Sequence, residues 1–292
     1  MAMDASKITL PHTIAQAVVN KVGDTSTIAK LSPSTPQLFT DTDFMFFNGK
    51  SEADVTAEGQ KKSSYEQDLQ YVSGTRFKVQ TTTRVTSELQ WADEDNRFQI
   101  IQRIQEDQAK AIARALDYVV YHAVNPKSGE KLDGFTALTT GARTVTATDD
   151  QIENVDALAD ALNEYEINGV ALSRTWAAQL RKLRVPATGM RFYPEIPINL
   201  DAGTLDGIPA ATSGTVNGKL AKTTTKVLGI MGDFSLINWG MVRDITAEII
   251  PYGDPDQTGV DLKAHNQIAY RSEAMFAYAI LDPQAFAVLK EK

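Results

Sequence analysis

The stretch that decides the fold is DEDNRFQIIQRIQEDQAKAIARALDYVVYHAVN, residues 93–125. Acidic residues open it, where the positive end of a helix dipole favours them, and Pro126 ends the predicted helix just after Asn125. Apolar residues recur between these ends at spacings compatible with a helical period; the predicted packing stripe comprises Ile101, Ile104, Ile112, Leu116 and Val119. The predicted helix is about 50 Å long, whereas helices in globular proteins average about 11–12 residues. This length exceeds what a compact domain needs.

The pattern of residues before this helix predicts an excursion, that is, an extended hairpin that projects from the rest of the fold. Apolar residues 44–47 precede a polar stretch from 50 to 70, after which residues 77–85 alternate between apolar and polar, as in a strand. We interpret the two apolar segments as a two-stranded excursion with a polar tip. A lone hairpin is at best marginally stable, so two interpretations stay open: a solvated insertion loop, or an arm that docks on a neighbouring subunit. On the second interpretation, the candidate assembly residues are the charged ones of the tip: Lys50, Glu52, Asp54, Glu58, Lys61, Lys62, Glu66 and Asp68.

The amino-terminal region consists of short amphipathic stretches, 14–22 and 26–31, separated by a Gly-Asp pair. Isolated helices below roughly 12–15 residues are marginal in water. This arm therefore needs a surface on which to lie.

The rest of the chain alternates between helix and strand patterns. Helices are predicted at 151–166 and 175–183, and strands at 169–173, 226–231, 245–251 and 268–280. The sequence therefore predicts a mixed α+β fold.

The sequence predicts no catalytic site, no metal site and no cofactor. The 292 residues include no cysteine, and none of the three histidines has a partner at the spacing of a metal site or a catalytic triad. Residues 254–259 resemble the start of a calcium loop but lack the bidentate Glu at the twelfth position, and 214–219 miss the spacing of a phosphate loop. We predict that both segments are turns.

Charge and hydropathy exclude further classes of function. The net charge of −8 opposes tight binding to duplex nucleic acid, and we interpret the basic cluster of Arg174, Arg181, Lys182 and Arg184 as a solvated helix face. No window approaches the roughly 20 apolar residues of a membrane span, and the first residues lack the pattern of a signal peptide. The expected protein is soluble and intracellular, without a membrane partner.

The order of these parts resembles the HK97-fold major capsid proteins of tailed bacteriophages. Local motifs agree with the resemblance: Gly232-Asp233-Phe234-Ser235 followed by the strand-like stretch 239–248, then 266–273, and finally Asp282-Pro283-Gln284-Ala285-Phe286. The resemblance covers nearly the whole chain, and it rests on the order and spacing of these motifs together.

The resemblance implies an HK97-like α+β fold with five parts. They are an N-arm at 1–42, a β-hairpin E-loop at 43–88, a P-domain at 89–139 that contains the spine helix 93–125, an A-domain at 140–243, and the carboxy-terminal strands of the P-domain at 244–292. The implied function is structural and not enzymatic. Subunits would form hexamers and pentamers that close into an icosahedral shell around double-stranded DNA, held by weak non-specific contact.

The same resemblance implies partners and a location. Subunits would assemble in the host cytoplasm with a portal and a separate scaffolding protein, unless the chain has already been shortened, and would end in the virion capsid. Some relatives join a loop lysine to an asparagine of a neighbour; Lys61 and Lys62 lie at the tip, and we predict no such crosslink. The alternatives are an encapsulin-type bacterial compartment shell, which has a similar fold, and a cytosolic α+β enzyme.

Overall fold

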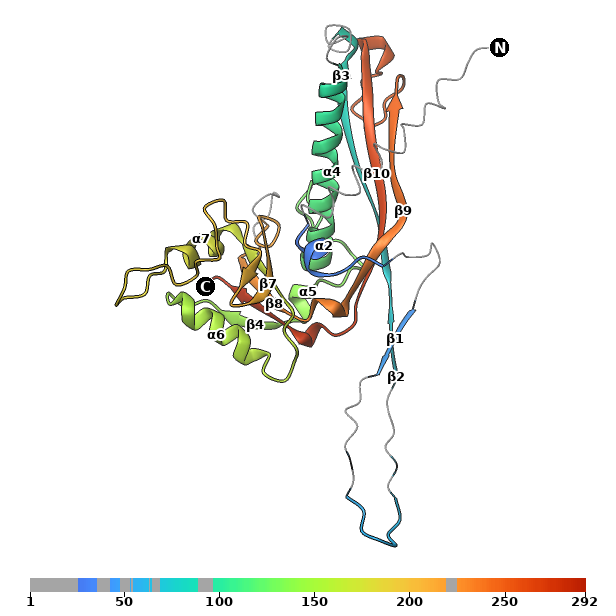
Figure 1. The fold of residues 1–292 in the computed structure, drawn as a ribbon. Coiled ribbons are helices and arrows are strands. Elements are labelled where there is room, and N and C mark those ends of the chain that lie inside the picture. Colours follow the sequence, from blue (N-terminus) through green and yellow to red (C-terminus); the bar gives the residue numbers. More distant parts are fainter. Residues whose placement is uncertain are drawn as a thin grey trace.

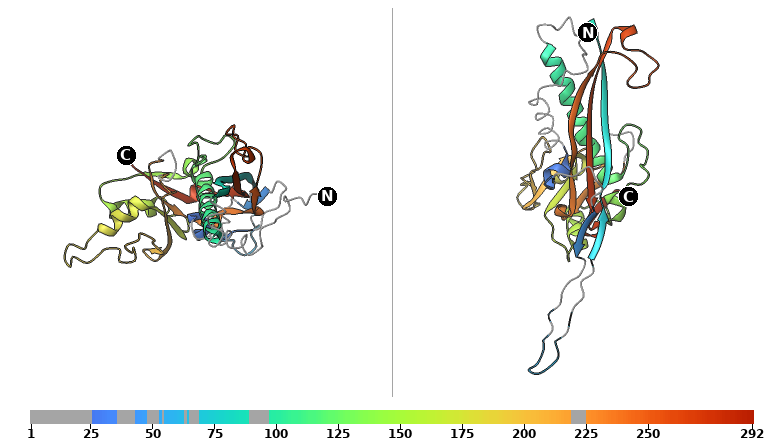
Figure 2. Two further views of the ribbon diagram at one scale, coloured as in Figure 1. Left: turned by 90° about the horizontal axis from the view of Figure 1, so that it is seen from above. Right: turned by 90° about the vertical axis from the view of Figure 1, so that its right-hand side faces the viewer.

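The computed structural model describes residues 26–35, 43–47, 53, 55–62, 64, 69–88, 97–218 and 225–292. These residues form a tall lobe built on one long helix, a second lobe beside its lower half, and a narrow loop that projects away from both (Figure 1). The views at right angles in Figure 2 show that the tall lobe is thin and elongated. The mixed α+β class predicted from the sequence is confirmed.

The tall lobe consists of helix α4 (Arg97–His122) packed on a three-stranded antiparallel sheet in the order β3-β10-β9. Its strands are β3 (Thr75–Thr86), β9 (Ile237–Ile250) and β10 (Gln267–Ile280). In the register of this sheet Phe276 lies opposite Phe77 on one side and Met241 on the other. The rings of Phe77 and Phe276 lie 5.6 Å apart and are buried in the core beneath α4.

Helix α4 ends at His122, three residues before the predicted end at Asn125. Ala123 adopts a left-handed conformation with φ of 51°, and its carbonyl accepts a hydrogen bond from Leu132 N at 2.8 Å. The chain then turns into a small loop closed by a bridge between Val124 and Lys131. The physical reason is the left-handed turn at Ala123, which ends the helix before Pro126 restricts Asn125. Residues 93–96 of the predicted helix lie outside the described residues.

The second lobe is a six-stranded mixed sheet in the order β4-β11-β8-β5-β7-β6, with α6 (Gln151–Ala161) and α7 (Arg174–Lys182) packed on it. The strands are β4 (Arg143–Thr146), β5 (Gly169–Ser173), β6 (Thr204–Leu205), β7 (Ile208–Ser213), β8 (Val227–Gly232) and β11 (Phe286–Lys290). Trp176 of α7 fills the space over Gly229 of β8, where a side chain would collide with the indole ring. Its Nε1 donates to Gln151 Oε1 of α6 at 3.0 Å, so one tryptophan joins both helices to the sheet.

The carboxy-terminal strand corrects the division of the chain predicted from the sequence. That prediction places 244–292 with the P-domain, but β11 lies inside the second lobe, parallel to β4 and antiparallel to β8. The predicted boundary at 243 also falls within the continuous strand β9. Residues 286–289 are all fully buried, and this apolar run needs cover on both faces. Its position in the mixed sheet provides that cover, because alternate residues of the run belong to two different hydrophobic cores.

The pairing of the projecting loop also differs from the prediction. β1 (Asp43–Phe47) pairs antiparallel with β2 (Leu69–Ser73), with Phe47 opposite Leu69. The alternating segment after it, β3, instead pairs along its whole length with β10. Because Phe77 is buried against aromatic rings of β10, β3 belongs to the core sheet, and the excursion is limited to residues 43–73.

The described part of the amino-terminal arm lies between the two lobes, and its helix α2 (Thr27–Leu31) contacts β5 and β7 of the second lobe as well as α4. The chain after α2 follows the start of β9: Ser32 Oγ donates to Ile237 O at 2.8 Å, and Trp239 Nε1 donates to Ser32 O at 3.0 Å. The prediction that this short helix needs a surface is confirmed for residues 26–35. The predicted stretch 14–22 lies outside the described residues.

Candidate functional site

The projecting loop is the first candidate for an assembly site. All of the described residues between positions 53 and 64 are exposed, and Val55, an apolar side chain, is 97% exposed. The tip is a turn in which Gln60 N donates to Ala57 O at 3.1 Å and Gly59 takes a φ of 79°, a conformation that glycine adopts without strain. The loop extends far from both lobes (Figure 1).

The predicted assembly residues divide into two groups. Glu58, Lys61 and Lys62 lie exposed at this tip, as expected. The other charged residues of the prediction lie outside the described residues: Lys50, Glu52, Asp54, Glu66 and Asp68.

The predicted packing stripe of the long helix is confirmed where its side chains are described. Ile112 and Leu116 are fully buried, and Val119 is nearly so, in the core shared with the sheet. Ile104 is partly buried, and the side chain of Ile101 lies outside the described set.

A buried carboxylate forms the main polar junction of the molecule. Asp117, in the carboxy-terminal part of α4, is fully buried and accepts five hydrogen bonds. Oδ1 accepts from Ser26 Oγ and from Ile28 N (3.3 Å). Oδ2 accepts from Thr27 N (3.0 Å), Thr27 Oγ1 (2.9 Å) and Thr215 Oγ1 (2.6 Å). One side chain thereby joins the arm, the spine helix and the loop 214–218 of the second lobe.

The electrostatics of this junction combine two opposed effects. Burial raises the pKa of Asp117, because it disfavours the charged carboxylate, while the donated hydrogen bonds of Ser26, Thr215 and Thr27 favour the charge and act against that rise. Burial also raises the pKa of Tyr121 well above its usual value, with a further contribution from the charge of Asp117. The Tyr121 hydroxyl lies 3.0 Å from Thr27 Oγ1, so it closes the network on the side of α2.

His122 forms a second contact between the spine and the same loop. Its Nε2 lies 3.2 Å from Thr215 O, and because a carbonyl only accepts, this nitrogen carries the proton. Burial lowers the pKa of His122 from 6.5 to about 4, so the ring is neutral at neutral pH. From the sequence alone His122 is interpreted as either a packed or a surface residue, and the structure shows that it is buried.

The sequence interpretation missed Asp117. The available signal was an acidic residue between Leu116 and Tyr118, within the most apolar part of the helix. Charged residues are rarely fully buried unless they are paired, so an acidic residue at this position indicates buried partners. The partners, however, lie 89 to 98 positions away in the sequence, so a single sequence offers no means to identify them.

The loop 254–259 forms the predicted turn, and the structure adds its partner. Arg84 of β3 donates to Asp254 Oδ1 at 2.6 Å, to Thr258 Oγ1 at 2.6 Å and to Asp256. The Arg84 guanidinium, through its hydrogen bonds above all, lowers the pKa of the Asp256 carboxyl. The oxygen atoms that resemble calcium ligands in the sequence therefore bind an arginine.

Within the described part of the chain, no group of three or more histidine and acidic side chains is arranged to hold a metal ion. None of the described helices is both long and apolar enough to cross a membrane. The segment 214–218 forms a turn, as predicted, and not a phosphate loop.

A spine helix on a long sheet, a second mixed lobe and an extended loop define an HK97-like capsid subunit, and solved structures of phage capsids share this architecture. A structure from Mycobacterium phage Ogopogo matches with a TM-score of 0.81 at 30% identity, covering 92% of each chain. One from Gordonia phage Cozz matches with a TM-score of 0.77 at 27% identity, covering 91% of this chain and 86% of that chain.

The chain belongs to the phage capsid family, whose pattern matches residues 7–291. The major capsid protein of Staphylococcus phage 80alpha is 24% identical over 288 residues, which cover 96% of this chain and 84% of that protein. The function is therefore that of a phage major capsid protein, a structural protein of the virion capsid.

Proposed function

We propose that copies of this chain form hexamers and pentamers that close into an icosahedral shell around double-stranded DNA. The observation that carries the proposal is the loop tip, where each described residue between 53 and 64 is exposed and Val55 presents 97% of its surface. An extended hairpin with so little contact to its own lobes gains stability only from another molecule. We infer that this molecule is a neighbouring subunit, so that the loops link the subunits of a capsomer.

The fold of relatives supports the closed shell. A solved structure titled as the capsid of an empty GTA particle, computed with C5 symmetry, shares the fold with a TM-score of 0.60 at 14% identity. Fivefold symmetry in that particle is what pentamers at the corners of an icosahedral shell require. Rings of identical subunits arise when head-to-tail contacts close on themselves.

The charge of the chain supports an enclosing role. A formal net charge of −8 disfavours tight binding to DNA phosphates, so a wall of these subunits would contain DNA with weak contact. We further propose that assembly takes place in the host cytoplasm with a portal and a separate scaffolding protein. We expect no catalytic activity from the subunit.

The test replaces residues 53–64 with a short Gly-Ser turn in the full chain. The expected result is an unchanged circular dichroism spectrum and melting temperature, because the exposed tip contributes little apolar burial, together with loss of closed particles in electron micrographs. The matched control replaces the same residues with a Gly-Ser segment of equal length, which separates the reach of the loop from its side-chain chemistry.

Normal closed particles from the shortened variant would contradict the assembly role of the loop. The contents of wild-type particles test enclosure separately. Double-stranded DNA in purified particles supports the proposal, whereas particles that hold a co-purifying enzyme and no nucleic acid would favour a compartment shell.

A further inference from the structure

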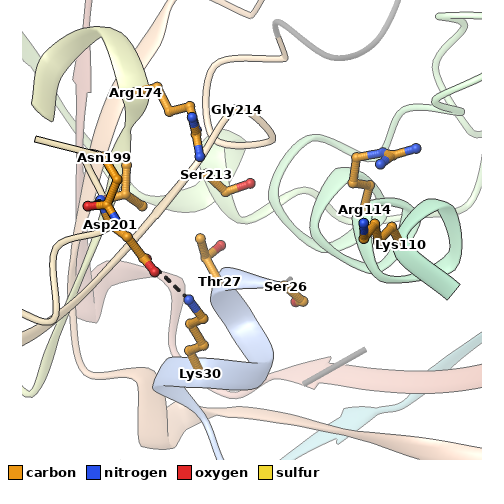
Figure 3. A pocket seen from close by; sticks show the side chains of 11 residues that line it. Ser26, Thr27, Lys30, Lys110, Arg114, Arg174, Asn199, Asp201, Ser213 and Gly214 are labelled. Atoms are coloured by element: carbon orange, nitrogen blue, oxygen red, sulfur yellow. Dashed lines mark hydrogen bonds and ion pairs between the residues drawn. The ribbon is translucent and has the colours of Figure 1, made fainter. Parts of the chain in front are cut away.

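A cavity of about 430 Å³ lies where the arm, the spine helix and the second lobe meet. Basic side chains from three elements line it: Lys30 of α2, Lys110 and Arg114 of α4, and Arg174 of α7. Figure 3 shows Arg174 on one side of the space, with Lys110 and Arg114 on the other. These residues are far apart in the sequence, so the cavity exists only in the folded chain.

The cavity carries a surplus of positive charge. Asp201 is the one acidic residue among the described residues that line it, and it pairs with Lys30 at 3.3 Å. Both side chains of this pair are more than a third exposed, so the pair is weak and Lys30 remains able to turn to a ligand. Lys110, Arg114 and Arg174 have no ion-pair partner within the described part of the chain, which leaves about three more positive than negative side chains in the lining. The buried carboxylate of Asp117 lies behind this lining, hydrogen-bonded to Ser26 and Thr27.

Two of the basic residues that line the cavity lie close to each other on the same helix. Lys110 and Arg114 are separated by one helical turn on α4, a spacing at which like charges repel. An anion in the cavity would relieve the repulsion.

Polar groups of the cavity wall retain hydrogen atoms to donate. Ser213 Oγ accepts from Thr215 N at 3.2 Å. Because the one hydrogen of the Thr215 hydroxyl goes to Asp117, the Ser213 hydroxyl donates to Thr215 Oγ1 at 3.0 Å, and its hydrogen is already used. Thr212 Oγ1 accepts from Ala202 N at 3.4 Å, and its own hydrogen has no acceptor among the described residues. Asn199 uses its carbonyl oxygen for Asp201 N at 3.2 Å and leaves its amide hydrogens available. The lining therefore offers donors of three kinds: guanidinium, ammonium, and neutral hydroxyl or amide.

We propose that this cavity binds a phosphate group. A single carboxylate would neutralise one of about three surplus charges, whereas a phosphate or pyrophosphate carries two or more at neutral pH. The planar guanidinium groups of Arg114 and Arg174 match two phosphate oxygens at once, and lysines act on them as point charges. The volume falls within the range of small-molecule sites, about 300–1,000 Å³.

The site goes beyond the shell-forming function and does not depend on it. The phosphate has two possible sources, a free small phosphate compound and the backbone of DNA. Because the cavity lies between the arm, the spine and the second lobe, a bound phosphate would stabilise the arrangement of these three parts within one subunit.

The test is isothermal titration of the full-length chain with pyrophosphate, with inorganic phosphate and with a 12-base-pair DNA duplex. The variants R114Q and R174Q each remove one guanidinium from the cavity, and R184Q serves as the matched control because Arg184 is exposed and does not line the cavity. We expect pyrophosphate to bind the wild type and R184Q equally, and each cavity variant at least about tenfold more weakly.

The arms of the experiment separate the sources. Binding of pyrophosphate alone supports a free phosphate ligand, and duplex binding that pyrophosphate displaces and R174Q weakens supports the DNA backbone. Equal affinities of the wild type and both cavity variants would overturn the proposal. Tighter binding of a decaglutamate peptide than of pyrophosphate would also overturn it and would indicate an acidic protein segment.

Melting temperatures without ligand verify that the variants fold. Where R174Q fails to fold, R174K replaces it, since lysine keeps the charge and loses the planar guanidinium group. R174K is expected to bind pyrophosphate about threefold more weakly than the wild type. Unchanged affinity in both R174K and R114Q would again count against the site.

Discussion

Replacement of Asp117 by asparagine tests whether one carboxylate holds the arm, the spine and the second lobe together. The substitution keeps the size of the side chain and exchanges one acceptor oxygen for a donor NH₂ group. Oδ1 receives two hydrogen bonds and Oδ2 receives three, so the NH₂ group is expected on the Oδ1 side. There the Ser26 hydroxyl is able to turn and accept, but the Ile28 N–H loses its acceptor.

The loss of stability in D117N can be worked out from the hydrogen bonds that the substitution removes or weakens. A stranded buried N–H costs about 1–3 kcal/mol, and each of the three bonds on the other oxygen weakens from a charged to a neutral one, a loss of about 1 kcal/mol each. Part of this loss is offset, since the amide avoids the desolvation penalty that raises the pKa of Asp117. We expect a net loss of about 3 kcal/mol in the free energy of unfolding, which lowers the melting temperature by about 6 °C.

The assay is differential scanning calorimetry of unassembled full-length subunits at one fixed protein concentration, because assembly would itself raise the melting temperature. D107N is the matched control, since Asp107 is exposed on the same helix, and it should change stability by less than about 0.5 kcal/mol. A double-mutant cycle with T215V then measures the coupling between the spine and the second lobe, expected at about 1 kcal/mol or more.

Two results would refute this reasoning. If D117N melted at the wild-type temperature, the five hydrogen bonds would contribute nothing net to stability. If D117N and T215V were additive within about 0.3 kcal/mol, the carboxylate would not link the two lobes.

Three further predictions concern buried positions of the two lobes. Burial lowers the pKa of His122 from 6.5 to about 4, so its contribution to the free energy of unfolding, about 3 kcal/mol, is complete above pH 6.5 and is lost as the pH falls to about 4. Urea titrations of H122Q should therefore show a smaller loss of stability between pH 6.5 and 4 than those of the wild type. H265Q, which alters an exposed histidine, should lose as much stability as the wild type. The variant I112D places a charge at a fully buried position and should leave the subunit unfolded by circular dichroism, whereas R103D, at an exposed position of α4, should fold; soluble native I112D would contradict the packing of the stripe. The variant G229A sets a methyl group against the buried indole of α7 and should lower the free energy of unfolding by about 1–3 kcal/mol; unchanged stability in urea would show that the ring has room to move.

The sequence alone predicted the parts of the fold that rest on local patterns. The apolar period of the long helix identified Ile112, Leu116 and Val119 as packing residues, and all three are buried. The end of that helix was three residues too late, because the left-handed turn at Ala123 depends on the loop that follows it. The exposed positions of Glu58 and Lys61 at the loop tip were also predicted, since a polar stretch between strands has no apolar surface to bury.

Strand pairing was less accessible from the sequence. The alternating pattern of β3 correctly indicated a strand with one face partly buried, but it carried no information on which strand would be its neighbour. Its assignment to the core sheet rests on the contact of Phe77 with Phe276, a residue 199 positions later. The same limit applies to β11, which the order of elements alone placed in the wrong lobe.

The sequence by itself therefore determined the long spine helix and the exposed loop, because both follow from the period and polarity of neighbouring residues. It indicated the class of protein only through the resemblance carried by the order and spacing of its motifs. Only the tertiary structure decided the junction at Asp117 and the basic cavity beside it. The residues of the junction and of the cavity come from the arm, the spine and the second lobe. The role of a buried carboxylate or of an unpaired basic side chain depends on the residues that folding brings next to it. Interactions between distant segments are physical properties of the packed chain, which no local pattern encodes.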